Sequence, residues 1–403
     1  MSIHVLIVPT EHFVTARYPL GGIFQLHQAR ALHRAGVRVG VVAPGVITSR
    51  FLLRRYPYDP FDDREGFPVL RRYVRKIYPS RWLRPSPGGG IYQDLGIQLY
   101  REYARRFGRP DVVHAHNFEY AGFVAQAIQR QTAVPYVVTE HSSLFLSGEG
   151  SGASSVALRA CAGAAATVTA VSRALADSVA RVVDAPVGVL PNVVDPSLLE
   201  APIVRAPRDR SAPVFLSVGS LDANKNHAAL IAAFAARFRG TGATLRIGGS
   251  GPLAGELRGL RSKLGVHDQV HLLGHLTRSQ LRDELGAADC LVLPSMQETF
   301  GVVLIEALVH GVPVIATRCG GPQDIVTETS GMLVDVGDVA GLGDALVRMA
   351  AGRQDYSPEA LRADCVARFG ARAFVTRATE LYRAALSVEH DPSSALPGSA
   401  LRR

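Results

Sequence analysis

The sequence contains no long hydrophobic run. None of its 403 residues lies in a stretch of about 18 consecutive apolar residues, which argues against a membrane-spanning helix. The apolar run inside MSIHVLIVPTEHF is too short for the hydrophobic region of a signal peptide and has no basic segment before it, so it predicts a first β-strand. The composition, 47% hydrophobic and 20% charged residues, is typical of a globular protein. Because neither a spanning helix nor a signal peptide is predicted, we expect the protein to be cytoplasmic.

Cysteine, metal and dinucleotide motifs are also missing. The first glycine turn lacks the Gly-x-Gly-x-x-Gly spacing of dinucleotide sites, which disfavours a nicotinamide cofactor. No Asp-x-Asp pair is present, and we therefore expect no metal requirement. The four cysteines have no Cys-x-x-Cys spacing and indicate neither a zinc site nor a disulfide framework; they are Cys161, Cys290, Cys319 and Cys365.

Basic residues outnumber acidic ones, with 44 Lys and Arg against 35 Asp and Glu. Much of the excess lies in an insertion at residues 45–95, where aromatic and aliphatic residues are interleaved and no regular pattern is visible. The insertion fits either a solvated face or, over residues 50–84, a surface that contacts an anionic membrane or acceptor. No recognition motif supports nucleic acid as a partner. The basic positions are Arg50, Arg54, Arg55, Arg71, Arg72, Arg75, Lys76, Arg81 and Arg84.

Short apolar runs alternate with amphipathic helical stretches along most of the chain, which is typical of doubly wound α/β units. A helix is predicted over Ile23–Arg34, with Gly36 just after its end. A last helical region is predicted over residues 358–386. Strands are predicted at residues 3–8, 37–42, 112–115, 136–139, 167–170 and 187–190, and then at 214–218, 244–247, 270–272, 291–293 and 314–316.

This organisation predicts an α/β protein of two Rossmann-like domains that face each other across a cleft. We expect an N-terminal, acceptor-binding domain over residues 1–196, a linker over 197–213 and a C-terminal, nucleotide-sugar-binding domain over 214–370. A terminal helix over 371–387 would pack back on the N-terminal domain, and residues 388–403 would form a disordered tail. Clefts between two such domains are favoured ligand sites.

The most informative segment is PSMQETFGVVLIEALVHGVPVIATRCGGPQDIV, residues 294–326. It predicts a strand, a loop, a helix over 302–310, a turn and another strand, with the loop from Glu298 to Gly301 beyond the carboxyl end of the first strand. The first backbone N–H groups of the helix form an anion site, and the carboxylates of Glu298 and Glu306 suit hydroxyl donors. A nucleotide sugar combines both features.

Other loops at strand ends add candidates. Lys225, at the end of a loop that begins at Gly219, stands near a helix start, where the helix dipole favours acids; a pyrophosphate contact explains it better than solvation. The loops Gly21-Gly22 and Gly248-Gly-Ser-Gly251 allow close approach of a ligand, or form ordinary turns. A planar base could pack against the loop that contains His275.

Two histidines end a predicted strand. We expect strand alternation to place the imidazoles of His114 and His116 on opposite faces of the sheet. This arrangement disfavours binding of one metal ion by both histidines. His116 stands at the carboxyl end of the strand and is placed to contact a substrate in the cleft. Glu140-His141 occupies the same position after the next strand.

Taken together, these residues resemble the retaining family-4 glycosyltransferases of the GT-B fold. The resemblance runs from Gly21 to about Leu386 and is strongest over residues 214–350. Its most specific piece is Glu298-x7-Glu306. The other matching motifs are Thr299-Phe-Gly301, Gly311-Val-Pro313, Cys319-Gly-Gly-Pro322, Asp111-Val-Val-His-Ala-His116, Val171-Ser172, Pro191-Asn-Val-Val-Asp195 and Gly248–Pro252.

The resemblance implies transfer of a sugar from a nucleotide donor to a glycan or lipid-linked acceptor of polysaccharide biosynthesis, with retention at the anomeric carbon. By motif position, Glu306 would bind the ribose and Glu298 the donor sugar. The backbone at Val302 and Val303, together with Lys225, would hold the diphosphate. We expect front-face attack assisted by the leaving phosphate, with Lys225, Glu298 and His116 as the catalytic residues. Gly21, Gly22, Gly219, Gly251, His275 and Gly301 complete the expected donor site.

One position departs from the family pattern. The family commonly has an arginine after the glycine of its first C-terminal loop, and here that position is Ser220. One of two usual cations is missing, or another arginine supplies it. Two alternatives follow: a GT-B nucleotide-sugar epimerase, against which the spacing of Glu298 and Glu306 argues, and an inactive sugar-nucleotide-binding scaffold, for which Ser220 is the one hint.

Overall fold

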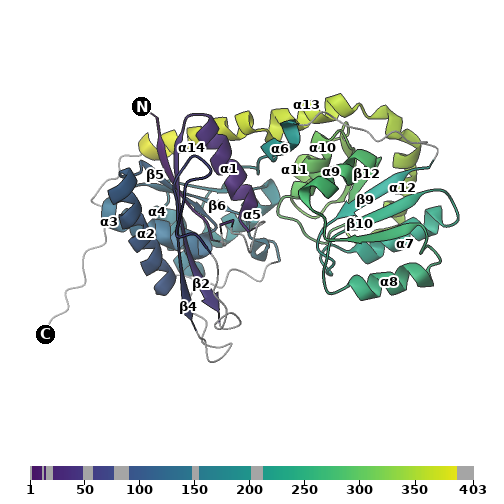
Figure 1. Cartoon of the computed structure of the whole chain (residues 1–403), viewed down its shortest axis with the longest axis horizontal. Coiled ribbons are helices and arrows are strands. Elements are labelled where there is room, and N and C mark those ends of the chain that lie inside the picture. Colours follow the sequence, from purple (N-terminus) through teal and green to yellow (C-terminus); the bar gives the residue numbers. More distant parts are fainter. Residues whose placement is uncertain are drawn as a thin grey trace.

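The protein consists of two α/β domains that lie side by side along its long axis (Figure 1). The computed structural model describes residues 2–10, 13–14, 21–48, 58–76, 90–147, 154–200 and 212–387. The expectations for Arg50, Arg54, Arg55, Arg81 and Arg84, for most of the linker and for the tail at 388–403 lie outside these described residues.

The N-terminal domain is built on a sheet that has, in the described residues, the strand order β3-β4-β2-β1-β5-β6-β7-β8. Neighbouring strands are parallel except for the antiparallel pair β3–β4. The strands are β1 (His4–Val8), β2 (Arg38–Thr48), β3 (Phe61–Asp62), β4 (Val69–Lys76), β5 (Val112–His116), β6 (Tyr136–Glu140), β7 (Thr167–Ala170) and β8 (Gly188–Val189).

Helices cover both faces of this sheet because its central strands are apolar on both sides. On β1, Leu6 and Val8 join one core cluster, whereas Val5 and Ile7 join another on the opposite face. The first face is covered by α2 (Ile91–Phe107), α3 (Phe123–Thr132), α4 (Ser155–Ala164) and α5 (Arg173–Val183), and the second by α1 (Ile23–Arg34) and the C-terminal helix. Short turns η3 (Phe118–Gly122) and η4 (Ser143–Phe145) follow β5 and β6.

The insertion at residues 45–95 is not irregular where it is described. β2 continues to Thr48, β4 pairs with β2 over eight residue pairs, and β3 adds a short antiparallel strand at the edge. The sequence VLRRYVRK of β4 places Arg71 on a buried position. The interpretation of the insertion's basic residues as a surface left the alternation of this strand unrecognised.

The C-terminal domain contains a parallel sheet with the described strand order β11-β10-β9-β12-β13-β14. Its strands are β9 (Val214–Val218), β10 (Thr244–Gly248), β11 (Val270–Gly274), β12 (Cys290–Leu293), β13 (Val314–Thr317) and β14 (Gly331–Val334). Its helices are α7 (His227–Phe238), α8 (Ala254–Lys263), α9 (Arg278–Ala287), α10 (Val302–Val309), α11 (Pro322–Ile325), α12 (Val339–Gly352) and α13 (Pro358–Phe369), with the short turn η5 (Arg353–Asp355). β14 and α12 were not predicted.

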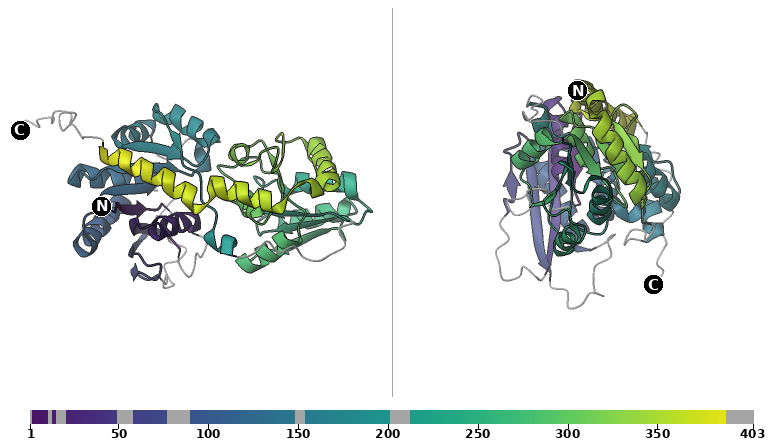
Figure 2. Two further views of the ribbon diagram at one scale, coloured as in Figure 1. Left: turned by 90° about the horizontal axis from the view of Figure 1, so that it is seen from above. Right: turned by 90° about the vertical axis from the view of Figure 1, so that its right-hand side faces the viewer.

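Two segments connect the domains. The chain leaves the N-terminal domain through α6 (Pro196–Glu200) and returns along α13 and α14 (Ala371–Ser387), which are separated at Gly370. α14 runs back across the N-terminal domain (yellow in Figure 2, left), where Phe374 and Tyr382 are buried beside α1. The hydroxyl of Tyr382 lies 2.8 Å from Nδ1 of His114, so this helix reaches the central strand β5.

Within the described part of the chain, no helix combines the length and the apolarity that crossing a membrane requires.

Candidate active site

A cleft of about 530 Å³ lies between the two domains. Loops at the carboxyl ends of strands line it from both sides, as expected for open parallel sheets. The N-terminal domain contributes Phe24, Asn117, His141, Ser142, Ser143 and Asn192, and the C-terminal domain contributes Val218, Lys225, Glu298, Thr299, Phe300, Gly301, Val302 and Val303.

The cleft contains an ion pair between Lys225 and Glu298. Nζ of Lys225 donates to Oε1 of Glu298, and the hydroxyl of Ser295 donates to the same oxygen over 2.8 Å. Both side chains are largely but not fully buried, with 22% and 12% of their surface exposed. A Cβ on Gly219 would lie 3.2 Å from the Lys225 side chain, so this glycine leaves room for the lysine stem. The pair presents a cation and a carboxylate to one ligand.

The loop that carries Glu298 is held by the two glycines after β13. The backbone N–H groups of Glu298 and Gly321 bond to the carbonyls of Cys319 and Glu298, over 3.1 and 2.8 Å. A Cβ on Gly321 would lie 2.3 Å from Cα of Phe300, and one on Gly320 would lie 2.6 Å from the Glu298 carbonyl oxygen. The Cys319-Gly-Gly motif is therefore required for close packing of two loops.

Helix α10 begins at the cleft. Gly301 takes the left-handed conformation, φ 97°, that starts the helix, and Leu304 N–H bonds back to its carbonyl over 2.9 Å. The N–H groups of Val302 and Val303 belong to the first turn, which has no carbonyl partners within the helix. Since the N-terminal end of a helix carries partial positive charge, these groups and Lys225 form a site suited to a phosphate-bearing anion.

Glu306 lies one turn further along α10 and does not line the cleft. Its Oε1 accepts from Nη1 of Arg278 over 2.5 Å. Burial raises the pKa of this carboxyl, and the neighbouring Arg278 opposes that effect. Sequence reasoning selected Glu306 but gave no sign that an arginine 28 residues away would hold it.

The predicted glycine loops pack against each other. A Cβ on Gly251 would lie 2.5 Å from the carbonyl oxygen of Leu221, and Gly219 N–H bonds to the Gly248 carbonyl over 3.0 Å. His275 is exposed on the loop after β11, outside the cleft. Gly22 takes the left-handed conformation that starts α1, and Gly21 accepts from Val14 N–H over 2.8 Å. These positions shape loops near the cleft rather than its wall.

The expectation for the two histidines of β5 was wrong. His114 and His116 are two positions apart, so the period of two places them on the same face of the strand, and their rings stack with centroids 4.4 Å apart. His116 is fully buried, with its Nδ1 2.9 Å from Nε2 of His141. Its Nε2 is buried without a hydrogen-bond partner among the described residues. His141, not His116, lines the cleft.

These imidazoles are neutral at physiological pH. Burial lowers the pKa of His114 and of His141 to about 3 each and lowers that of His116 well below its usual value. Behind them, burial raises the pKa of Glu140 to about 7, although it accepts from the backbone N–H groups of Phe118, His141 and Ser142. His141 therefore presents a neutral hydrogen-bonding ring to the cleft.

Among the N-terminal cleft residues, His141 was noted only for its place at a strand end, and Asn117 and Asn192 were not predicted to line the cleft. The Glu140-His141 strand end was a usable signal. Asn117 holds the loop by accepting from His141 N–H over 2.8 Å and has φ 73°, an uncommon backbone conformation. Asn192 accepts from Gln28 over 3.2 Å. These residues line the cleft only because the fold brings the ends of separate strands together.

Ser220, the position without the expected arginine, hydrogen-bonds to Asp222 over 2.5 Å. Asp222 also accepts from Lys225 N–H over 3.0 Å, so the serine takes part in the turn that positions the lysine. Lys225 is the one lysine or arginine among the described residues that line the cleft. That another arginine supplies the charge absent at Ser220 stays a prediction.

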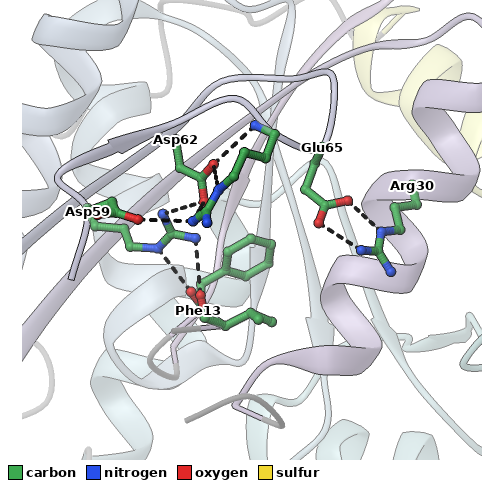
Figure 3. A network of polar contacts seen from close by, with 8 residues as sticks. Phe13, Arg30, Asp59, Asp62 and Glu65 are labelled. Carbon is green, nitrogen blue, oxygen red and sulfur yellow. Dashed lines mark hydrogen bonds and ion pairs between the residues drawn. The ribbon is translucent and has the colours of Figure 1, made fainter. Parts of the chain in front are cut away.

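Arg71 is not part of a basic surface, which corrects the interpretation of the insertion. It is 5% exposed and donates to the carbonyls of Phe13 and Val14 over 3.0 and 3.2 Å and to Asp62 over 3.4 Å. Phe13 and Asp62 are labelled in Figure 3 beside the separate pair of Arg30 and Glu65. Arg72, by contrast, is partly exposed and pairs with Glu102 over 2.8 Å.

The described residues contain no group of three or more His, Cys, Asp or Glu side chains arranged to hold a metal ion.

Two family models match the chain and together span both domains. The model described as Glycosyltransferase Family 4 matches residues 22–198, and the one described as Glycosyl transferases group 1 matches residues 212–351. The chain is also 30% identical, over 322 residues, to the glycogen synthase of Mycobacterium tuberculosis, with 75% of each protein covered. The chain therefore belongs to the group 1 and family 4 glycosyltransferases and is a transferase enzyme, as predicted.

Further relatives cover almost the whole chain. The putative teichuronic acid biosynthesis glycosyltransferase TuaC of Bacillus subtilis is 26% identical over 369 residues, which is 87% of this chain and 90% of that protein. The crystal structure of HepE from Anabaena in complex with UDP matches with a TM-score of 0.69 and 20% identity, covering 94% of this chain and 99% of that one. The structural likeness confirms the GT-B fold.

Proposed function

We propose that this glycosyltransferase binds its nucleoside diphosphate sugar on the C-terminal wall of the cleft and transfers the sugar with retention at the anomeric carbon. One observation carries the proposal: Lys225, Glu298 and the start of α10 converge on that wall. A cation beside free helix N–H groups suits a diphosphate, and a carboxylate beside them suits sugar hydroxyls.

In this proposal each group has one task. Lys225 and the N–H groups of Val302 and Val303 stabilise the charge that develops on the departing nucleoside diphosphate. Glu298 binds hydroxyls of the donor sugar, and Glu306 binds those of the ribose. The acceptor oxygen bonds to the anomeric carbon as the bond to the β-phosphate oxygen breaks on the same face, and the acceptor proton passes to that phosphate.

The N-terminal wall is proposed to hold the acceptor. His141 is neutral, and because its Nε2 faces Nδ1 of His116, its Nδ1 is the ring nitrogen left to donate or accept a hydrogen bond from a substrate, according to its tautomer. This arrangement supports a substrate-contacting role for His141, with His116 fixing its ring from behind. The roles expected for Gly21-Gly22 and His275 stay predictions.

We further propose a lipid-linked glycan acceptor and action at the inner face of a membrane. The similarity to TuaC, a putative teichuronic acid biosynthesis glycosyltransferase, and the arginine- and aromatic-rich composition of residues 50–57 and 78–84 support this assignment. Co-sedimentation with vesicles tests it. Binding to vesicles of anionic lipid, and weaker binding to neutral ones, is the expected outcome; equal absence of binding to both contradicts it.

No metal is assigned a role in this proposal because Lys225 and the start of α10 supply positive charge where the diphosphate would lie. We therefore expect the same rate of transfer with and without EDTA. A rate that collapses in EDTA and returns with Mg²⁺ or Mn²⁺ would overturn this point.

A donor panel tests the proposed function. UDP-, GDP- and ADP-sugars are screened by thermal shift, since a ligand that binds the folded state raises its melting temperature. The best donor is then followed for nucleoside diphosphate release with a glycan acceptor, and the anomeric proton of the product is assigned by NMR. Stabilisation by one donor and retained configuration support the proposal; an epimerised sugar with no transfer, or no binding of any donor, contradicts it.

A further inference from the structure

Arg278 connects two buried carboxylates beside the cleft. Its Nη1 donates to Oε1 of Glu306 over 2.5 Å, and its Nη2 lies 3.9 Å from Oδ2 of Asp195. The carboxylates are each 8% exposed, whereas the arginine side chain is 38% exposed. Arg278 and Glu306 belong to the C-terminal domain, and Asp195 stands where the chain leaves the N-terminal domain.

The position of Arg278 in its helix does not explain its presence. It is the first residue of α9, where the helix dipole disfavours a cation. The start of α9 is already satisfied by a capping box, in which Thr277 accepts from Gln280 N–H and Gln280 accepts from Thr277 N–H. The arginine therefore contributes nothing to capping, and its contacts are with the carboxylates.

The charges that face Glu306 come from two other elements. Arg278 approaches from α9, and Asp195 approaches from the segment before α6. Behind Asp195, His27 of α1 lies 3.5 Å from its Oδ2, and burial lowers the pKa of this histidine to about 4, so it is neutral at pH 7. On α10 itself, Nδ1 of His310 contacts the backbone carbonyl of Glu306 and not its carboxylate. Arg278 is thus the cation that these contacts bring to Glu306.

We propose that Arg278 is a positioning residue for donor binding, which holds the carboxylate of Glu306 in one orientation and in its charged form so that it can accept hydrogen bonds from the ribose hydroxyls. This inference rests on the proposed function, because it takes the ribose as the ligand of Glu306. It assigns to Arg278 no contact with the donor.

The contact geometry fits this role. The ion pair uses Oε1, which leaves Oε2 outside it and able to accept from a second partner. A charged carboxylate accepts through both oxygens, whereas a protonated one gives up part of that capacity to its own O–H group. Since burial raises the pKa of Glu306 and Arg278 opposes the rise, removing the guanidinium favours the protonated, poorly accepting form.

The test compares ligands that differ only in the ribose. Wild type, Arg278→Met and Arg278→Lys are titrated calorimetrically with UDP, ADP and GDP and with the 2′,3′-dideoxy form of whichever binds wild type best. We expect Arg278→Met to weaken binding of the ribonucleotide by about tenfold or more, the scale of one charge-assisted hydrogen bond, and to leave dideoxynucleotide binding nearly unchanged. Arg278→Lys should be intermediate because it keeps the charge but not the planar fork.

Two controls isolate the path through Glu306. Arg282→Met removes an exposed arginine one turn along the same helix and should not change binding. In a Glu306→Gln background, Arg278→Met should add no further loss, since its target carboxylate is gone. Because a higher pH favours the charged carboxylate, the ribonucleotide affinity of Arg278→Met should rise with pH more steeply than that of wild type.

The outcomes distinguish failure of the positioning role of Arg278 from failure of the proposed function. Equal loss of ribo- and dideoxynucleotide binding in Arg278→Met would overturn the positioning role, and so would unchanged binding. Arg278→Lys gives the same comparison if the methionine variant does not fold. Failure of wild type to bind any nucleoside diphosphate, or to prefer the ribonucleotide, contradicts the proposed function itself and is visible without any variant.

Discussion

Lys225 and Glu298, which lie 73 positions apart in the sequence, form an ion pair at the wall of the interdomain cleft. Ser295 supports the carboxylate, and Asp222 holds the backbone N–H of the lysine. In the absence of donor the two charges neutralise each other. In the proposed function a nucleotide sugar would give each its own partner, the diphosphate for Lys225 and the hydroxyls for Glu298.

Glu298→Gln tests the carboxylate half of this site. The amide keeps the shape but accepts more weakly and no longer balances Lys225, so we expect donor KM to rise about tenfold or more with partial kcat retained. Initial rates over a range of donor concentrations measure this split. Unchanged KM and kcat would contradict a role for Glu298 in binding the donor sugar.

Gly321→Ala tests whether loop packing maintains the site. The added Cβ would lie 2.3 Å from Cα of Phe300, so the loop of residues 298–301 must shift and donor affinity should fall by about tenfold or more, since small misplacements of catalytic groups are costly. The control is Gly259→Ala on exposed helix α8, where nothing lies within 4 Å; it should leave activity intact and stabilise by up to about 1 kcal/mol. Equal activity of both variants would refute the packing argument.

Arg71→Met tests the burial of an arginine in the basic insertion. Its removal leaves the carbonyls of Phe13 and Val14 without this donor, while the carboxylate of Asp62 keeps Arg64, and we expect a loss of about 3 kcal/mol in the free energy of unfolding. Arg72→Met breaks a partly exposed pair and should cost less than about 1 kcal/mol. Chemical denaturation of both variants gives the comparison, and similar small losses would show that Arg71 is not structural.

The buried histidines predict acid sensitivity. Burial lowers the pKa of His114 and His141 to about 3 and that of His27 and His227 to about 4, below the ordinary value of 6.5. Between pH 6.5 and about 4 the unfolded chain binds protons that the folded chain does not, so stability falls as pH falls, by up to about 1.4 kcal/mol per pH unit for each histidine.

Two buried carboxyls act in the opposite direction, because burial raises the pKa of Glu306 as well as that of Glu140. The pKa of Glu140 is raised from 4.5 to about 7, so its contribution is fully present below pH 4.5 and is lost as pH rises through 7. These two carboxyls offset only part of the effect of the histidines, which include His116 besides the four named above. The free energy of unfolding, measured by denaturant at pH 7, 6 and 5, should fall steeply, and His114→Gln should reduce the slope by nearly one proton. A flat profile would rule out this burial of neutral imidazoles.

Local patterns were sufficient for much of the fold. The helix Ile23–Arg34 and the strand Val214–Val218 have the predicted bounds, because apolar periodicity and flanking glycines determine them. β4 was missed because its alternation includes Arg71, whose burial depends on carbonyls at Phe13 and Val14, more than fifty residues earlier. The helical region predicted over 358–386 consists of two helices, α13 and α14, and α14 has the bounds predicted for the terminal helix over 371–387.

The part of the candidate site that lies within one continuous segment could be predicted from the sequence. The loop from Glu298 to Gly301 and the start of α10 lie together in sequence, and the structure keeps them together at the cleft. The pairing of Arg278 with Glu306 joins separate elements and leaves no local pattern. The same-face arrangement of His114 and His116 follows from the period of a strand and could have been predicted from the sequence.

The most direct test of the account is the rate of sugar transfer by Lys225→Ala with the donor that best stabilises wild type. Loss of one preorganised donor to the leaving group should lower kcat by about a hundredfold or more, while exposed Lys263→Ala on α8 should keep the wild-type rate. Circular dichroism and melting temperature establish that both variants are folded. A folded Lys225→Ala enzyme with the kcat of wild type would contradict the assignment of this cleft as the catalytic site.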